Sequence, residues 1–171
     1  MQEIKTVLTP IDFSDNAGKI ARAAAYVAGT FKAQLHYVFV VQNFEDYSGF
    51  FVPPVTMPNL EEELFESAQK RMDDFIGEQR RMFDGHGLDK VEGKVLAGDV
   101  AEEILRYSDE LGAGLIVMGT HGYKGLERIM FGSVADQVVK TSCCPVLTIN
   151  PYRAECEART RSEAGQGMHR F

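Results

Sequence analysis

The strongest constraint on the fold is an alternation of apolar runs and helix-like stretches along the chain. Five short apolar runs, each bounded by turn-forming residues, occupy residues 5–10, 33–41, 91–98, 113–119 and 145–150. Such runs predict buried strands, and the stretches between them have the periodicity of helices. Strands that alternate with helices form a parallel sheet that is covered on both faces. We therefore predict an α/β fold with a single doubly wound, Rossmann-like sheet of five parallel strands, because a barrel of this kind needs eight.

The helix-like stretches carry apolar residues at intervals of three and four. In the first stretch, the residues expected to face the sheet are Ala17, Ile20, Ala21, Ala24, Val27, Ala28 and Phe31. In the second, they are Leu64, Ala68, Met72, Phe75, Ile76 and Met82. Ser14 and Asp99 are the candidate N-caps of the first and third helices, because their side-chain oxygens can accept a hydrogen bond from an amide of the first turn.

The length of the chain predicts one domain with a full core. The 171 residues are too few for two comfortable domains, and we place the single domain at residues 1–150. Residues 42–59 contain a glycine, three prolines and several aromatic residues without a period, which indicates a long connection that is either a functional cover or mobile. Residues 151–171 are charged and weakly patterned, so we expect a weakly ordered C-terminal extension there.

Charge and composition argue against several classes of function. The net charge of −7, without a visible basic face, argues against binding to nucleic acid, which requires neutralisation of phosphates. No run approaches the roughly 18 apolar residues that cross a membrane, and the first ten residues do not resemble a signal peptide. The three cysteines, two of them adjacent at Cys143 and Cys144, are not a disulfide framework. We therefore expect a cytoplasmic protein without a membrane or nucleic-acid partner.

A glycine-rich stretch, residues 119–139, joins the fourth predicted strand to the last predicted helix. Gly119 and Gly122 come after the strand, and Gly132 with Ser133 opens the helix. A helix N-terminus has unpaired amides and the positive end of the helix dipole, so it accepts phosphate, and a serine hydroxyl can add a hydrogen bond. Glycines also cap strands and helices without binding anything, but this position beyond the carboxyl end of a buried strand favours a phosphate site.

Asp12 is the second candidate for ligand binding. It follows the first predicted strand, at the sheet edge that also carries the glycine-rich stretch. Acidic residues at such positions accept hydrogen bonds from ribose hydroxyls in nucleotide-binding folds. Asp12 can equally be a helix-entry residue beside Ser14, and spacing alone supports both interpretations.

These segments together resemble the universal stress protein family over about residues 3–150. The pattern Gly119-x2-Gly122-x9-Gly132-Ser133 fits the glycine signature of the ATP-binding branch of that family. The segments VLTPIDFSDNA, LIVMGTHG and CCPVLTIN are similar to its opening segment, its fourth strand and its final strand. The resemblance implies a five-stranded parallel sheet that binds an adenine nucleotide, ATP or else ADP or AMP, at its carboxyl edge, in a protein that acts in stress tolerance through a signalling partner that the sequence does not name.

The resemblance also implies roles for individual residues. For the base and the sugar it implies Pro10, Asp12, Val40, Met118 and Gly119, with Val40 acting through its backbone. For the phosphates it implies Gly122, Gly132, Ser133 and Val134. The chain departs from the family at Phe39 and Gln42, where His and Asp are often found. This departure concerns the contacts with the base, although a backbone contact from Val40 does not depend on those side chains.

Three functions remain open at this point. The leading hypothesis is a nucleotide-binding regulatory protein without a catalytic residue of its own. A slow ATPase or self-phosphorylating enzyme is the alternative: the chain lacks a Gly-x4-Gly-Lys-Ser/Thr loop, but Asp12 and Ser133 could share a Mg²⁺. A ligand-independent dimeric interaction module is the second alternative, and the intact glycine signature argues against it.

The last predicted strand is a candidate interface between two copies of the chain. An exposed strand at the edge of a sheet favours aggregation unless it is paired or shielded. Family members commonly dimerise through this strand, so the resemblance implies a homodimer through Val146 to Asn150.

Overall fold

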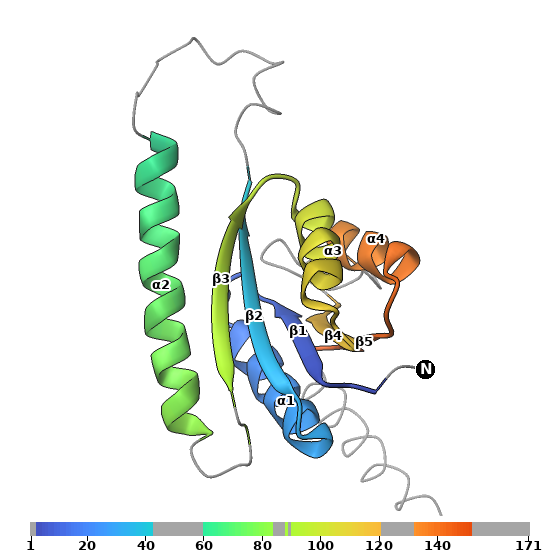
Figure 1. Ribbon diagram of the computed structural model, residues 1–171. Helices are drawn as coiled ribbons and strands as arrows, with labels where there is room; N and C mark the ends of the chain where they lie inside the picture. The colour runs from blue at the N-terminus through green and yellow to red at the C-terminus, as the bar shows by residue number, and fades with distance from the viewer. Residues whose placement is uncertain (1–2, 43–59, 84–87, 89, 121–131, 152–171) are drawn as a thin grey trace, which may run out of the picture.

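The computed structural model describes residues 3–42, 60–83, 88, 90–120 and 132–151 (Figure 1). Five strands and four helices alternate in the order β1 (Thr6–Pro10), α1 (Ala17–Phe31), β2 (Gln34–Val41), α2 (Leu60–Met82), β3 (Val91–Ala97), α3 (Val100–Leu111), β4 (Leu115–Gly119), α4 (Ser133–Thr141) and β5 (Val146–Ile149). All strand pairs are parallel, and the order across the sheet is β3-β2-β1-β4-β5. The predicted fold class is therefore confirmed.

Two hydrophobic cores lie on opposite faces of the sheet. The α1/α2 core contains Val7, Leu35, Tyr37, Met72 and Val117, among others. The α3/α4 core contains Leu8, Val38, Val40, Ile104, Ile116, Met118, Ala135 and Val138, among others. Successive residues of one strand enter different cores, because side chains alternate between the two faces. The strands are therefore apolar on both faces, as a sheet that helices cover on both sides requires.

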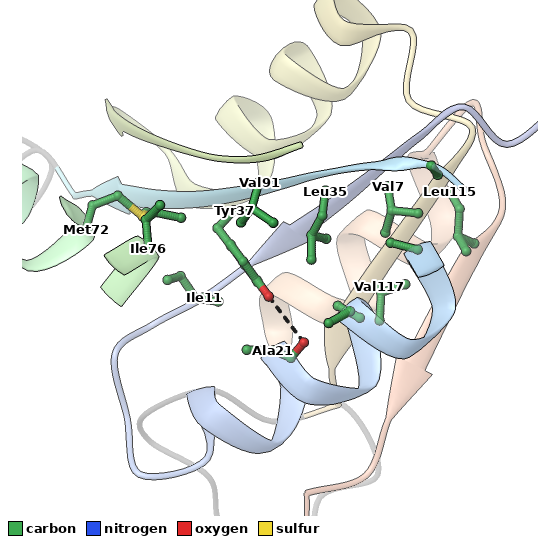
Figure 2. Packing of buried hydrophobic residues seen from close by; sticks show 14 of the residues in the cluster. Val7, Ile11, Ala21, Leu35, Tyr37, Met72, Ile76, Val91, Leu115 and Val117 are labelled. Atoms are coloured by element: carbon green, nitrogen blue, oxygen red, sulfur yellow. Dashed lines mark hydrogen bonds between the residues drawn. The ribbon is translucent and has the colours of Figure 1, made fainter. Parts of the chain in front are cut away.

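Tyr37 is the largest fully buried side chain and joins β2 to α1 (Figure 2). Its hydroxyl donates a hydrogen bond to the carbonyl of Ala21 at 3.2 Å, and its ring meets Phe75 of α2 edge-on at 5.3 Å. Burial raises the pKa of the Tyr37 hydroxyl, so the group stays protonated as a donor. The alanines of the buried face of α1 leave room for this large ring against the sheet.

The prediction of a buried side chain is wrong at two positions. Phe31 is 50% exposed and Met82 is 49% exposed. Phe31 is the last residue of α1, where the chain turns through the left-handed C-cap Lys32 and Ala33 takes the buried position. The buried stripe of α2 runs through Ala68, Met72, Ile76 and Gln79 and continues to Phe83. Met82 lies to the side of that stripe because the helix turns by about 100° per residue.

The two predicted N-caps have different outcomes. The prediction that Asp99 is the N-cap of α3 is confirmed, because its Oδ1 accepts a hydrogen bond from the amide of Glu102 at 3.0 Å. The prediction for Ser14 is wrong, because α1 begins at Ala17 with Asn16 as its N-cap. The amide of Ser14 instead donates to Oδ1 of Asp12. Ser14 is therefore part of the turn between β1 and α1. No helix in the described ranges is both long and apolar enough to cross a membrane.

Candidate functional site

The candidate site lies where β1 and β4 are neighbours in the middle of the sheet. The helix after β1 packs in the α1/α2 core, whereas the helix after β4 packs in the α3/α4 core. The chain therefore leaves these adjacent strands toward opposite faces, the arrangement in which doubly wound sheets bind ligands in a crevice beyond the carboxyl ends of the strands. Pro10 and Asp12 come from the first of these strand ends and Met118 and Gly119 from the second, as the sequence predicted.

A pair of backbone hydrogen bonds closes the glycine-rich stretch at its base. The amide of Gly132 donates to the carbonyl of Thr120 at 2.8 Å, and the amide of Thr120 donates to the carbonyl of Ile149 at 2.9 Å. The end of β4 and the start of α4 are thus held together beside β5. Sequence reasoning did not identify Thr120, because no pattern marks a carbonyl that pairs with a residue twelve positions later. Gly122 lies outside the described residues.

The start of α4 has backbone amides without an acceptor among the described residues. Gly132 is the N-cap, with an extended backbone (φ −69°, ψ 157°) and no side-chain capping bond. The amide of Asp136 donates to the carbonyl of Gly132, which leaves the first-turn amides of Ser133, Val134 and Ala135 without an intrahelical acceptor. Ser133 is exposed, whereas Val134 and Ala135 pack in the α3/α4 core. This helix end can therefore hold an anion without rearranging its packing.

The charge near this helix end is largely balanced. Asp136, in the first turn of α4, forms an ion pair with Lys140 at 2.7 Å on the exposed face of the helix. The carboxylate is thus partly neutralised by a residue of its own helix. The positive end of the helix dipole remains available to a ligand.

Val40 provides the opposite wall through its backbone. The amide of Ile11 donates to the carbonyl of Val38 at 2.9 Å, where the pairing of β1 with β2 ends. Backbone groups two residues apart face the same neighbouring strand, so the N–H and C=O of Val40 face the side from which β1 has departed. No backbone hydrogen bond joins them to a described residue on that side. The N–H donor and the C=O acceptor of Val40 are therefore without a partner among the described residues. Such a neighbouring donor and acceptor match the edge of a purine base.

The floor between these two walls is apolar. Val40, Met118 and Ala135 belong to the same α3/α4 core, and Val40 and Met118 are 7% and 4% exposed. Pro10, at the end of β1, is half-buried between the two strands that carry them. Eight of the nine predicted residues thus lie at the carboxyl edge of the sheet, on β1, β2, β4, the turn after β1 and the start of α4.

Asp12 sits in a tight turn that follows β1. Its Oδ1 accepts a hydrogen bond from the amide of Ser14 at 3.0 Å, and Asp12 is half-buried. Phe13, between Asp12 and Ser14, has a left-handed backbone with φ of 53°. The interpretation of Asp12 as a helix-entry residue holds, because one carboxylate oxygen shapes the turn. The ribose interpretation stays a prediction, for which the second oxygen is available, since it has no hydrogen bond from a described residue. Nothing in the local pattern predicted the conformation of Phe13.

The described residues do not form a ready-made metal site. Within those ranges, no three His, Cys, Asp or Glu side chains gather closely enough to hold a metal ion. Mg²⁺ typically keeps several waters and takes few protein ligands, so a nucleotide-borne Mg²⁺ does not need such a cluster.

Comparison with known proteins agrees with this fold. Residues 3–150 match the model of the universal stress protein family. Universal stress protein MJ0531 of Methanocaldococcus jannaschii is 34% identical over 153 residues, covering 88% of this chain and 85% of that protein. The solved structure of universal stress protein UspA from Lactobacillus plantarum superposes with a TM-score of 0.74 at 22% identity, covering 88% of this chain and all of the other.

A second solved structure is that of a complex with a nucleotide. It is the universal stress protein from Archaeoglobus fulgidus in complex with dAMP, with a TM-score of 0.58 at 23% identity, covering 88% of this chain and 100% of the other. The family match spans most of the chain and includes both strand ends that build the crevice. The chain therefore belongs to the universal stress protein family.

Proposed function

We propose that this protein binds an adenine nucleotide, with ATP as the preferred ligand, and acts as a nucleotide-dependent regulatory protein in stress tolerance. The observation that carries the proposal is the hydrogen bond from Gly132 to Thr120, which holds the uncapped start of α4 beside the end of β4. The amides there, and the backbone groups of Val40, lie beyond the carboxyl ends of parallel strands at one edge of the sheet and have no partner among the described residues. The complex of the Archaeoglobus fulgidus protein with dAMP supports an adenine nucleotide as a ligand of this fold.

The proposed binding mode assigns each part of the nucleotide to one part of the crevice. The base lies on the apolar floor of Pro10 and Met118 and pairs with the backbone of Val40. The ribose lies between Asp12 and Gly119. The phosphates are bound by the residues of the glycine signature and the start of α4, which are Gly122, Gly132, Ser133 and Val134. A Mg²⁺ that accompanies the triphosphate is then held by phosphate oxygens and water, with Asp12 or Ser133 as the candidate protein ligands.

Removing one amide tests this proposal without removing the helix. Ser133 is the first residue of α4, a position where proline is favoured, and the extended backbone of Gly132 is the conformation that a following proline requires. Ser133→Pro therefore deletes the N–H and the hydroxyl with little strain, whereas Ser133→Ala deletes the hydroxyl alone. Because a hydrogen bond to a charged group contributes about 1.5–3 kcal/mol, we expect Ser133→Pro to weaken ATP binding by about 10- to 100-fold.

The measurement is isothermal titration calorimetry with ATP, ADP and AMP. Val100→Pro is the matched control, since Val100 is the first residue of α3 and follows the extended N-cap Asp99 at the same sheet edge. This variant should bind ATP as the parent does. Equal ATP affinity of Ser133→Pro and the parent protein would refute the proposed phosphate site. Release of phosphate at many turnovers per protein would instead favour the ATPase alternative.

The proposal includes a homodimer through β5. This strand is at the edge of the sheet, and Leu147 is 38% exposed. The carbonyl of Pro145 accepts a hydrogen bond from Ile116 of β4, and that of Ile149 accepts one from Thr120, the residue after β4. The backbone groups of Val146 and Thr148 therefore face away from β4. Thr148→Pro removes an outward N–H without breaking a bond to β4. We expect light scattering to show a dimer for the parent and for Thr148→Val, and a monomer for Thr148→Pro; a monomeric parent at micromolar concentration would contradict the proposal.

The cellular setting of the proposal is the cytoplasm. Cys143 and Cys144 have free thiols, and Cys143 is exposed. Thiols of this kind persist in reducing compartments. Cell fractionation with an antibody to the protein tests this part, and recovery mainly outside the cytoplasmic fraction would contradict it.

A further inference from the structure

Phe13 has a backbone conformation that its position in the chain does not explain. Its φ of 53° lies in the left-handed region, which residues other than glycine rarely adopt because Cβ crowds the following carbonyl. Among the described non-glycine residues, only Lys32 shares this feature. Lys32 is the C-cap of α1, a place where a left-handed residue is common. Phe13 caps no helix, so this strain suggests a functional constraint.

The ring of Phe13 is held by side chains from two other elements. Its centroid is 4.7 Å from that of Phe39 on β2 and 6.0 Å from that of Phe75 on α2. The guanidinium carbon of Arg71, also on α2, lies 4.8 Å from the ring centroid. Aromatic and cation–π contacts of this kind stabilise a ring in one orientation. The contacts therefore offset the strain and keep the left-handed turn in place.

This turn determines where the Asp12 carboxylate lies. The hydrogen bond from the Ser14 amide to Oδ1 of Asp12, at 3.0 Å, closes a turn around Phe13, and the left-handed backbone of Phe13 is part of that turn. The bond fixes one oxygen of the carboxylate, so the other oxygen has a defined direction at the end of β1. Arg71 and Phe75 of α2 thus influence the position of the Asp12 carboxylate indirectly, through their contacts with the ring of Phe13.

We propose that Phe13 is a positioning residue that aims the Asp12 carboxylate at the ribose and so sets the preference for ribonucleotides over 2′-deoxyribonucleotides. The inference rests on the proposed function, since it assigns the ribose to Asp12. It adds a specificity determinant that does not itself touch the nucleotide. The ring contributes through its contacts with Phe39, Phe75 and Arg71.

The test compares the affinities for ATP and dATP by calorimetry in the full chain. The parent should bind ATP about 10-fold more tightly than dATP, the lower end of what a hydrogen bond to a charged group provides. Phe13→Gly keeps the left-handed backbone accessible but removes the ring, and we expect the ratio to fall to about 2 with ATP still bound. Phe13→Tyr keeps the ring contacts and should retain the ratio. Phe39→Leu loosens one side of the ring and should give an intermediate ratio.

Asp12→Ala is the reference variant, because it lacks the carboxylate. It should reduce the ratio of ATP affinity to dATP affinity to about 1. Adding Phe13→Gly to Asp12→Ala should change this ratio no further, because the ring acts only through the carboxylate. A merely structural role of Phe13 would weaken both nucleotides equally and leave the ratio intact, which would overturn the inference. A parent that binds both nucleotides equally also overturns it, whereas a parent that binds neither refutes the proposed function itself. Far-UV circular dichroism of each variant confirms that the compared proteins are folded.

Discussion

Two glycines of this protein should respond to the same substitution with opposite signs. Gly114 directly precedes β4, and its amide donates to the carbonyl of Thr6 at 2.9 Å. A Cβ built on Gly114 would lie 2.8 Å from Cα of Ile4 and 3.1 Å from the carbonyl oxygen of Glu3. Both are backbone atoms, so no side-chain rotation relieves the contact. For Gly77, within α2, no described residue places an atom within 4 Å of the equivalent position, apart from its chain neighbours and the backbone of its own helix.

The magnitudes follow from these distances. Carbon atoms pack best at about 3.5–4.0 Å, so Gly114→Ala must push the chain before β1 away from β4 by about 0.7 Å or more. Overpacking of this kind costs about 1–3 kcal/mol, and the lower backbone entropy of the unfolded alanine variant returns about 0.4–1 kcal/mol. We therefore expect a net loss of about 1–2 kcal/mol. For Gly77→Ala we expect a gain of about 0.5–1 kcal/mol from helix propensity.

Urea unfolding measures both changes. The chain contains no tryptophan, so far-UV circular dichroism is the suitable signal. With a slope of about 2 kcal/mol per molar urea, the midpoint should fall by about 0.5–1 M for Gly114→Ala and rise by about 0.3–0.5 M for Gly77→Ala. A midpoint of Gly114→Ala at or above that of the parent would refute the steric reasoning. It would mean that the backbone of Glu3 and Ile4 can move away from the new Cβ without loss of stability.

Three further predictions concern stability. Asp99→Ala should lower the free energy of unfolding by about 1 kcal/mol in urea, because α3 loses its N-cap, and Asp99→Ser should restore most of it. Tyr37→Phe should cost about 0.5–1.5 kcal/mol, because the buried hydrogen bond to Ala21 is lost; an unchanged midpoint would show that the bond contributes nothing. Burial lowers the pKa of His36 below 6.5, overriding the nearby Glu92 carboxylate, so the unfolded chain binds a proton first as the pH falls. Stability should therefore decrease between about pH 6.5 and the folded pKa, and His36→Leu should lack this decrease when both proteins are unfolded at pH 7.5 and 5.5.

The fold could be predicted because its signals are local. Strand and helix periods, and the order in which they alternate, do not depend on contacts between distant residues. The conformation of Phe13 does depend on such contacts, since its ring is held by residues 39, 71 and 75. At the start of α1 the miss is local: a hydrogen bond between Asp12 and Ser14 replaces the expected cap, and residue types alone do not distinguish such a turn from a cap. Sequence reasoning therefore identified the elements correctly and missed what tertiary contacts impose on the turns between them.

The candidate site could be predicted only in part, for the same reason. The glycine pattern located Gly119 and Gly132 at the correct ends of β4 and α4, because glycines mark places where the backbone bends or binds. Their mutual approach depends on the carbonyl of Thr120, and the open backbone of Val40 depends on where β1 stops. Hydrogen bonds between backbone groups leave no trace in residue type, so only the structure reveals them.

The bond between Gly132 and Thr120 has an evolutionary consequence. It joins the two ends of residues 121–131 on a stem that the sheet holds in place. When both ends of a segment are tied, its length influences stability weakly, because each doubling adds only about 0.6 kcal/mol of closure entropy. We therefore expect insertions between residues 121 and 131 to cost the fold little, so that the spacing of Gly122 and Gly132 is constrained by the proposed phosphate site and not by stability.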